Sequence, residues 1–216
     1  MEEEREEDYT MSWVSRITPK ILFGPKPESK QDVEYLKRFV GTIVNLLIPS
    51  ATYTKISEFR SKRMMKRAVM TSQSYLGYYD IDEDAEEFPM HYISLPFDVD
   101  AIVATGRLKE DQMRKRADAY VQHARKIASA AKAGSIYIHS KTGFLTEAFI
   151  AFAVWGLTAS KQEAPTDIRV WFSQTVNAPQ STINMNVFNE DEENLLLLEC
   201  IWKEARKPAS PFHKTK

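Results

Sequence analysis

The stretch best suited to chemistry is IYIHSKTGFLTEAF, at residues 136–149. A short apolar run leads into a polar turn with one glycine, Gly143, and then into an amphipathic helix. A turn that joins a strand to a helix N-terminus can direct backbone N–H groups at an anion. This turn offers the Ser140 hydroxyl and the Lys141 ammonium, but it has no cysteine and no arginine. The pattern therefore indicates the outline of a phosphate site, and its chemistry depends on the individual side chains.

Two other kinds of strand–turn–helix loop are excluded by their glycines. A nucleotide-binding P-loop needs lysine after its second glycine, whereas phenylalanine follows Gly143, and Gly134 precedes the strand instead of the turn. The nucleophile elbow of serine hydrolases needs glycine two residues before and after the serine. Ile138 and Thr142 occupy those places around Ser140, so this reading fails as well.

The register of the turn resembles the loop of the cysteine-dependent phosphatases, which reads His-Cys-x-x-Gly-x-x-Arg. The matching residues are His139, Ser140, Lys141, Thr142, Gly143, Phe144, Leu145 and Thr146. From about Trp13 to Lys207 the chain also resembles the dual-specificity group of that family. ITPKILFGPKPESKQDVEYLKRFVGTIVNLL is similar to its first strands and helix, HYISLPFDVD to its general-acid strand and loop, and NVFNEDEENLLLLECIWKEAR to its closing helix.

The residues that depart from the family pattern are the ones its reaction needs. Ser140 stands at the position of the thiolate nucleophile, and its hydroxyl has a far higher pKa and no paired base in the pattern. Thr146 stands at the position of the arginine whose planar fork holds two phosphate oxygens. Each lost electrostatic stabiliser costs ~10²–10³ in rate. Glu147, in the first helical turn, should repel an incoming phosphate. Asp98 matches the general acid in position, and without a nucleophile it is better interpreted as a residue that caps a turn.

We therefore expect a pseudophosphatase, a catalytically inactive protein without cofactor or metal that binds a protein or a phosphoprotein. A substrate-trapping laboratory variant would keep the arginine, so Thr146 indicates natural degeneration. One alternative is a structural or assembly subunit of a larger particle, for example a virion component, with a vestigial pocket. A lesser alternative is weak residual phosphatase activity with Ser140 as the nucleophile.

The elements that would position this loop alternate between strands and helices. Such alternation predicts an α/β fold, a three-layer sandwich with a mostly parallel central sheet flanked by helices. The expected helices span residues 29–40, 108–134, 143–157 and 189–207, and the expected strands include 42–48, 90–97 and 135–140. Residues predicted on buried helix faces are Val33, Leu36, Phe39, Val40, Met113, Ala117, Tyr120, Val121, Ala124, Ile127 and Ala128.

Around a phosphatase-like domain at 13–207, the sequence predicts an acidic tail at 1–12, a C-terminal tail at 208–216 and an insertion at about 57–88. The insertion combines a basic helix with an acidic loop at 80–87. Neutralisation of the two on a solvated face is the favoured interpretation, and a partner-docking or nucleic-acid surface is the alternative. The candidate partner surface consists of Arg60, Lys62, Arg63, Lys66 and Arg67.

The composition argues against several classes of function, including nucleic-acid binding, cysteine-based sites and membrane insertion. The chain has 216 residues and a formal net charge of −1, so bulk charge does not favour nucleic acid. The single cysteine, Cys200, excludes a disulfide framework and a cysteine-based zinc site. No apolar stretch reaches the length of a membrane span, and no secretory signal is expected. We therefore expect an intracellular, cytoplasmic protein without a membrane partner. The sequence leaves a nuclear location, the partner and the oligomeric state open.

Overall fold

The computed structural model describes residues 14–27, 29–47, 69–71, 89–97, 109–131, 134–140, 145–160, 165–176 and 191–207. Its strands are β1 (Ser15–Thr18), β2 (Ile21–Pro25), β3 (Thr42–Asn45), β4 (Val69–Thr71), β5 (Pro89–Ser94) and β6 (Ile136–Ser140). Its helices are α1 (Lys30–Phe39), α4 (Glu110–Ala130), α5 (Leu145–Thr158), α6 (Ile168–Val176) and α8 (Glu192–Ala205).

The strands form one mixed sheet in the order β1-β2-β6-β3-β5-β4. The four central strands β2, β6, β3 and β5 are parallel, whereas β1 and β4 pair antiparallel to their neighbours at the two edges. The predicted α/β class is confirmed, and the parallel arrangement holds for the centre of the sheet. The edge strand β4 was not predicted, because it lies in a segment that the sequence pattern assigned to the insertion at 57–88.

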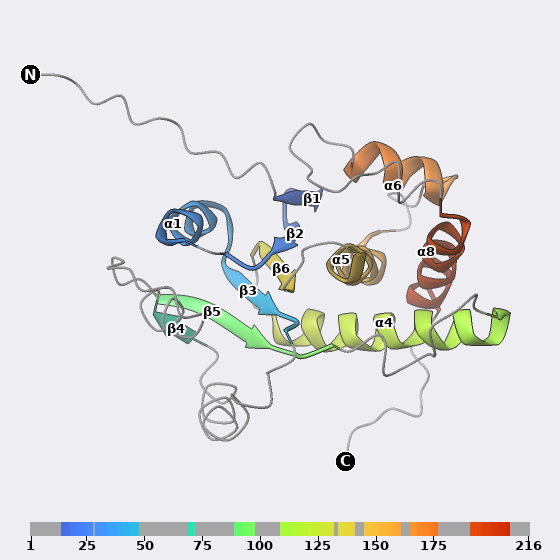
Figure 1. The fold of residues 1–216 in the computed structure, drawn as a ribbon, viewed down its shortest axis with the longest axis horizontal. Coiled ribbons are helices and arrows are strands. Elements are labelled where there is room, and N and C mark those ends of the chain that lie inside the picture. The colour runs from blue at the N-terminus through green and yellow to red at the C-terminus, as the bar shows by residue number, and fades with distance from the viewer. Residues whose placement is uncertain are drawn as a thin grey trace, which may run out of the picture.

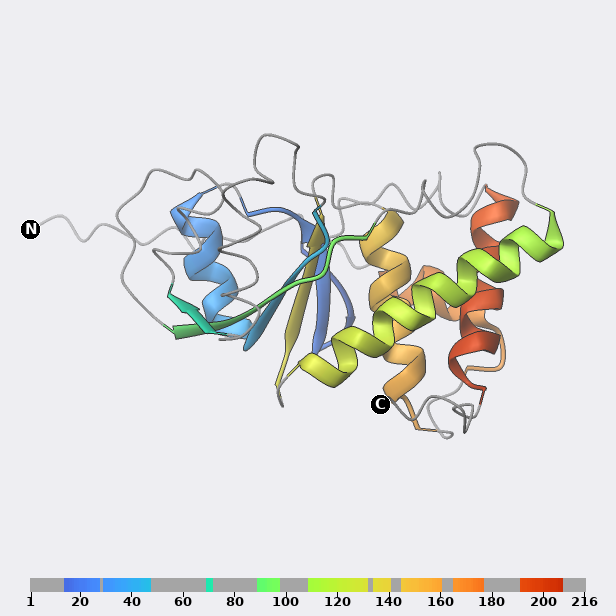
Figure 2. The same cartoon turned by 90° about the horizontal axis from the view of Figure 1, so that it is seen from below.

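Helices flank the sheet on both sides. Figure 2 shows α1 on one face and α4, α5, α6 and α8 on the opposite face. Figure 1 shows α5 end-on, between the sheet, α4, α6 and α8. Since α5 follows β6 directly in the chain, this arrangement fixes both sides of the loop that joins them.

Helix α1 begins as the sequence predicts. The Ser29 side chain accepts a hydrogen bond from the backbone N–H of Asp32, and the Asp32 carboxylate accepts one from the Ser29 N–H, a capping box that satisfies two free donors. Val33 and Leu36 are fully buried. The prediction for Phe39 is wrong: its side chain is 44% exposed at the last residue of the helix, although the Tyr35 ring and the Arg16 guanidinium lie against its ring.

Helix α4 buries the predicted stripe with one exception. Met113, Ala117, Tyr120, Val121, Ala124 and Ile127 are all buried. Ala128 is exposed, as are the two residues after it, because the last turn of the helix extends beyond its packing surface. His123 is buried and was not part of the predicted stripe. Gly134 follows the end of the helix with φ +144, a backbone conformation that glycine adopts easily because it has no Cβ.

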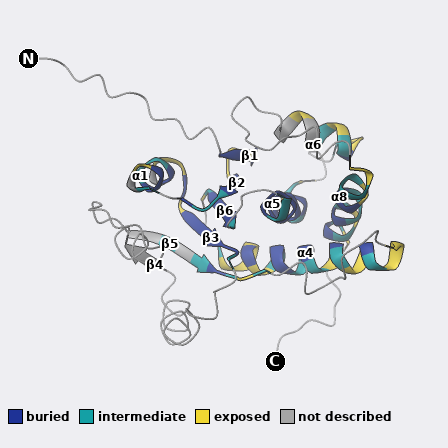
Figure 3. Ribbon diagram, in the orientation of Figure 1, coloured by how far each residue is buried: buried dark blue, intermediate teal, exposed yellow. Residues whose placement is uncertain are grey.

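Helix α5 lies at the centre of the larger helical layer. Every residue from Glu147 to Gly156 is buried, and Figure 3 shows α5 almost entirely in the buried colour. Near its end α5 passes close to α8, where a Cβ added to Gly156 would lie 3.1 Å from the Cβ of Ala205. In the part of the chain that the structure describes, no helix combines the length and the apolar character needed to cross a bilayer.

Candidate functional site at the β6–α5 junction

The candidate site begins where β6 ends. Ser140 is the last residue of β6, is partly exposed and pairs in register with Pro25 of β2. Helix α5 starts at Leu145, and Thr146 is its second residue. Residues 141–144 lie outside the described residues. The two positions that the phosphatase reaction would need, Ser140 and Thr146, therefore lie on either side of a short connection at the carboxyl end of a central parallel strand, where α/β proteins place their ligands.

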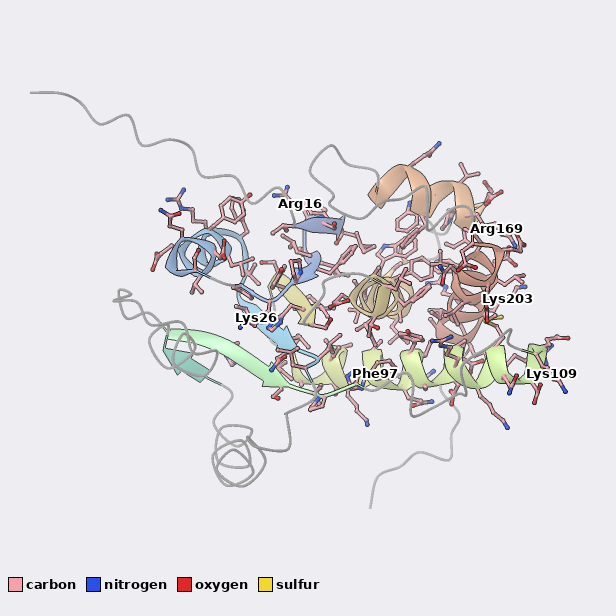
Figure 4. All side chains as sticks on the ribbon, viewed as in Figure 1. Arg16, Lys26, Phe97, Lys109, Arg169 and Lys203 are labelled. Atoms are coloured by element: carbon pink, nitrogen blue, oxygen red, sulfur yellow. The ribbon has the colours of Figure 1, made fainter. Side chains whose placement is uncertain are left out.

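The ends of the neighbouring strands add polar groups at this edge of the sheet. Asn45 ends β3, is fully buried and accepts a hydrogen bond from the Leu47 N–H at 2.8 Å. Ser94 ends β5 and is also buried. Lys26 follows β2 directly and is partly exposed, and its charge reaches the ring of His139. Figure 4 labels Lys26 in this region. The sequence interpretation missed these three residues, in part because Asn45 and Ser94 lie inside the runs at 42–48 and 90–97 that it assigned to strands.

His139 supports the end of β6 from inside the protein. Its ring is completely buried, and this burial is the main reason that its pKa falls to about 3; a hydrogen bond with the Ser140 backbone opposes the shift, and the Lys26 charge adds to it. The neighbouring Tyr137 ring stacks at 6.0 Å, and the Tyr137 hydroxyl donates to the Pro25 carbonyl at 2.7 Å. A neutral, buried imidazole fits the predicted supporting role better than the role of a base for Ser140.

The first turn of α5 faces helix α4 through polar side chains. Tyr120 is 2% exposed, and its hydroxyl lies within hydrogen-bonding reach of the side chains of Thr146 and Arg116. Burial raises the pKa of Tyr120 to about 12; the Glu147 charge acts in the same direction, while Arg116 and the Thr146 hydroxyl oppose it. Glu147 is fully buried. The sequence predicted a buried Tyr120 but not this meeting of four side chains, which none of the spacings along the chain reveals.

A second connection at the same end of the sheet is held by His123. After β5, the Leu95 carbonyl lies 3.0 Å from Nε2 of His123, and the Phe97 ring packs on the His123 ring at 4.7 Å and on Tyr120 at 5.0 Å. Burial lowers the pKa of His123 to about 4, so the ring is neutral near pH 7. These contacts fasten the chain to α4 immediately before Asp98.

Several predicted residues cannot be placed. Asp98 and the loop residues Lys141, Thr142, Gly143 and Phe144 lie outside the described residues. The candidate partner surface Arg60, Lys62, Arg63, Lys66 and Arg67 and both predicted tails lie outside them too. Of the predicted loop, His139, Ser140, Leu145 and Thr146 are described, and Leu145 packs partly buried against the core. Among the described residues no three His, Cys, Asp or Glu side chains are grouped so that they could hold a metal ion.

A separate pocket of about 370 Å³ lies between the start of α6 and α8. Arg169 crosses it, with Nε 2.6 Å from a Glu199 oxygen and an Nη 3.1 Å from a Glu192 oxygen, and these two carboxylates raise the pKa of the guanidinium. Figure 4 labels Arg169 and Lys203, which both line this pocket. The residues that line this pocket all belong to the start of α6, the residues just before it and α8, so the pocket adds no group to the β6–α5 junction.

In comparisons with known proteins, no protein-family model and no curated protein sequence matches the chain. The function of the junction is therefore inferred from the side chains of its described residues. It presents two hydroxyl groups, a buried neutral histidine, a buried carboxylate and a guanidinium from a neighbouring helix. Each of these groups can donate or accept a hydrogen bond, so together they could contact a polar ligand.

Proposed function

We propose that this chain is a catalytically inactive relative of the dual-specificity phosphatases, a pseudophosphatase that acts as a protein-binding or phosphoprotein-binding module. One observation carries the proposal. Ser140 ends the parallel strand β6, and Thr146 lies in the first turn of the helix that follows, the two places where the phosphatase loop has its nucleophile and its phosphate clamp.

The surroundings of the two positions support inactivity. A serine hydroxyl needs a base, and the adjacent imidazole of His139 is fully buried with a pKa of about 3, too low to accept a proton at neutral pH. Thr146 faces the Tyr120 hydroxyl on α4. A threonine offers one hydroxyl in place of the five N–H donors of an arginine. Both chemical requirements of the family's reaction are therefore unmet, while the α/β framework remains.

Turnover of a generic aryl phosphate tests this function. We expect the purified protein to show none above buffer, and Ser140→Ala to be indistinguishable from it. A double variant, Ser140→Cys with Thr146→Arg, is the matched control, because it puts back both groups that the family uses. Robust turnover by the natural protein that Ser140→Ala abolishes would refute the proposal.

A further inference from the structure

The Tyr120 hydroxyl is the point where α4 and α5 meet at the candidate site. Thr146 and Glu147 approach it from the first turn of α5, and Arg116 approaches it from one turn earlier on α4. Tyr120 is buried and keeps its proton at any physiological pH, so it acts as a fixed hydroxyl that holds Arg116 against α5. A guanidinium is therefore present beside Thr146, although the loop itself carries no arginine.

Arg116 retains hydrogen-bonding capacity at this place. Its side chain is partly exposed, but its Nε–H is buried and has no acceptor within the described ranges. A buried donor without a partner destabilises the protein, so a ligand that supplies an acceptor gains free energy on binding. The planar guanidinium suits the oxygens of a phosphoryl group or a sulfate, which it can bind through two parallel N–H donors.

The charge of Glu147 does not close the site to an anion. Glu147 and Arg116 act on the Tyr120 hydroxyl with opposite sign, so a positive charge lies near this hydroxyl as well as the buried carboxylate. Lys26 adds a further cation at the end of β2. The first N–H groups of α5 have no partner within the helix and favour an anion at this end.

We propose that Arg116, reaching across from α4, replaces the missing loop arginine, so that Arg116, the Thr146 hydroxyl and the start of α5 bind the phosphoryl group of a phosphorylated protein. This inference rests on the proposed function and specifies its ligand. It also assigns Arg116 a binding role that is independent of any turnover.

Calorimetric titration with inorganic phosphate, with sulfate as a second probe, tests the assignment. We expect Arg116→Ala to weaken phosphate binding at least about tenfold. Arg116→Lys keeps the charge but loses the fork, and it should fall between the natural protein and Arg116→Ala. Arg114→Ala is the matched control, since Arg114 lies on the same helix with its guanidinium 2.6 Å from Glu110 on the exposed face. It should bind phosphate like the natural protein.

Thr146→Arg separates failure of this inference from failure of the proposed function. If only Thr146→Arg binds phosphate, the loop is intact and Arg116 supplies no clamp. Equal loss in Arg116→Ala and Arg114→Ala likewise overturns the role of Arg116. If neither the natural protein nor Thr146→Arg binds, both the clamp and the phosphoprotein-binding function are refuted. Should Arg116→Ala lower the melting temperature, Arg116→Lys carries the comparison.

Discussion

The two ends of helix α5 are built from different kinds of contact. At its start, Thr146 and Glu147 meet Tyr120 and Arg116 in a polar cluster beside the candidate site. Near its end, Trp155 stacks on Trp171 of α6 with ring centroids 3.9 Å apart and planes 7° apart, and on Trp202 of α8 at 5.0 Å. The difference teaches that one buried helix can pack through stacked aromatic rings at one end and through polar side chains at the other.

The aromatic end should carry most of the stability. Trp155 is 5% exposed, and Trp155→Ala removes a large buried ring together with two stacking contacts. We expect the free energy of unfolding to fall by about 3–5 kcal/mol, measured from urea unfolding curves. Val170→Ala, at a side chain that is 50% exposed, should change it by less than about 0.5 kcal/mol. Similar losses for both variants would contradict the comparison.

Acid should weaken the polar end selectively, because His123 and His139 both lie near it. An unfolded histidine takes up a proton near pH 6.5, whereas folded His123 does so only near 4. Between these values the unfolded state binds more protons than the folded state. The contribution of neutral His123 to the free energy of unfolding is therefore fully present above about pH 6.5. It is lost as the pH falls toward 4, by up to about 1.4 kcal/mol per pH unit.

Urea unfolding midpoints at pH 7 and pH 5 measure this effect. Carboxylates also titrate as the pH falls, so the informative quantity is the difference between the natural protein and His123→Gln. We expect the variant to lose less stability between the two pH values. A glutamine can still donate to the Leu95 carbonyl, which His123 contacts at 3.0 Å. Equal pH dependence in both proteins would show that His123 is not a neutral buried group.

The hydroxyl of Tyr120 should contribute a smaller amount. Tyr120→Phe keeps the ring packed on Phe97 and Phe149 but removes the group that Thr146 and Arg116 share. We expect a loss of about 1 kcal/mol in the free energy of unfolding. Tyr35→Phe, at a partly exposed tyrosine on α1, gives the value for a tyrosine hydroxyl outside this cluster. If Tyr120→Phe is neutral, the polar cluster is not held together at this hydroxyl.

The sequence predicted the framework better than the cluster. Periodicity located α1, α4, α5 and α8 and the strands β3, β5 and β6, because each carries an apolar pattern over several residues. β4 has only three residues, which are too few for a pattern. Phe39 fits the spacing of the buried face of its helix, but it lies at the end of the helix and is exposed. Tyr120 was recognised as buried, but its contacts with Thr146 depend on how α4 packs on α5, which local spacing does not determine.

The ion pairs on the outside of the aromatic end should matter least. Arg169 is about one-third exposed and bonds Glu199 at 2.6 Å and Glu192 at 3.1 Å, so water and salt screen the charges. We expect Arg169→Met to lower the free energy of unfolding by less than about 1 kcal/mol, and the loss to shrink at 0.5 M salt. Arg114→Met, whose exposed partner is Glu110, gives the value for a single pair on the surface of a helix. A loss in Arg169→Met that rivals Trp155→Ala and resists salt would mean that charge, not aromatic stacking, anchors this end of α5.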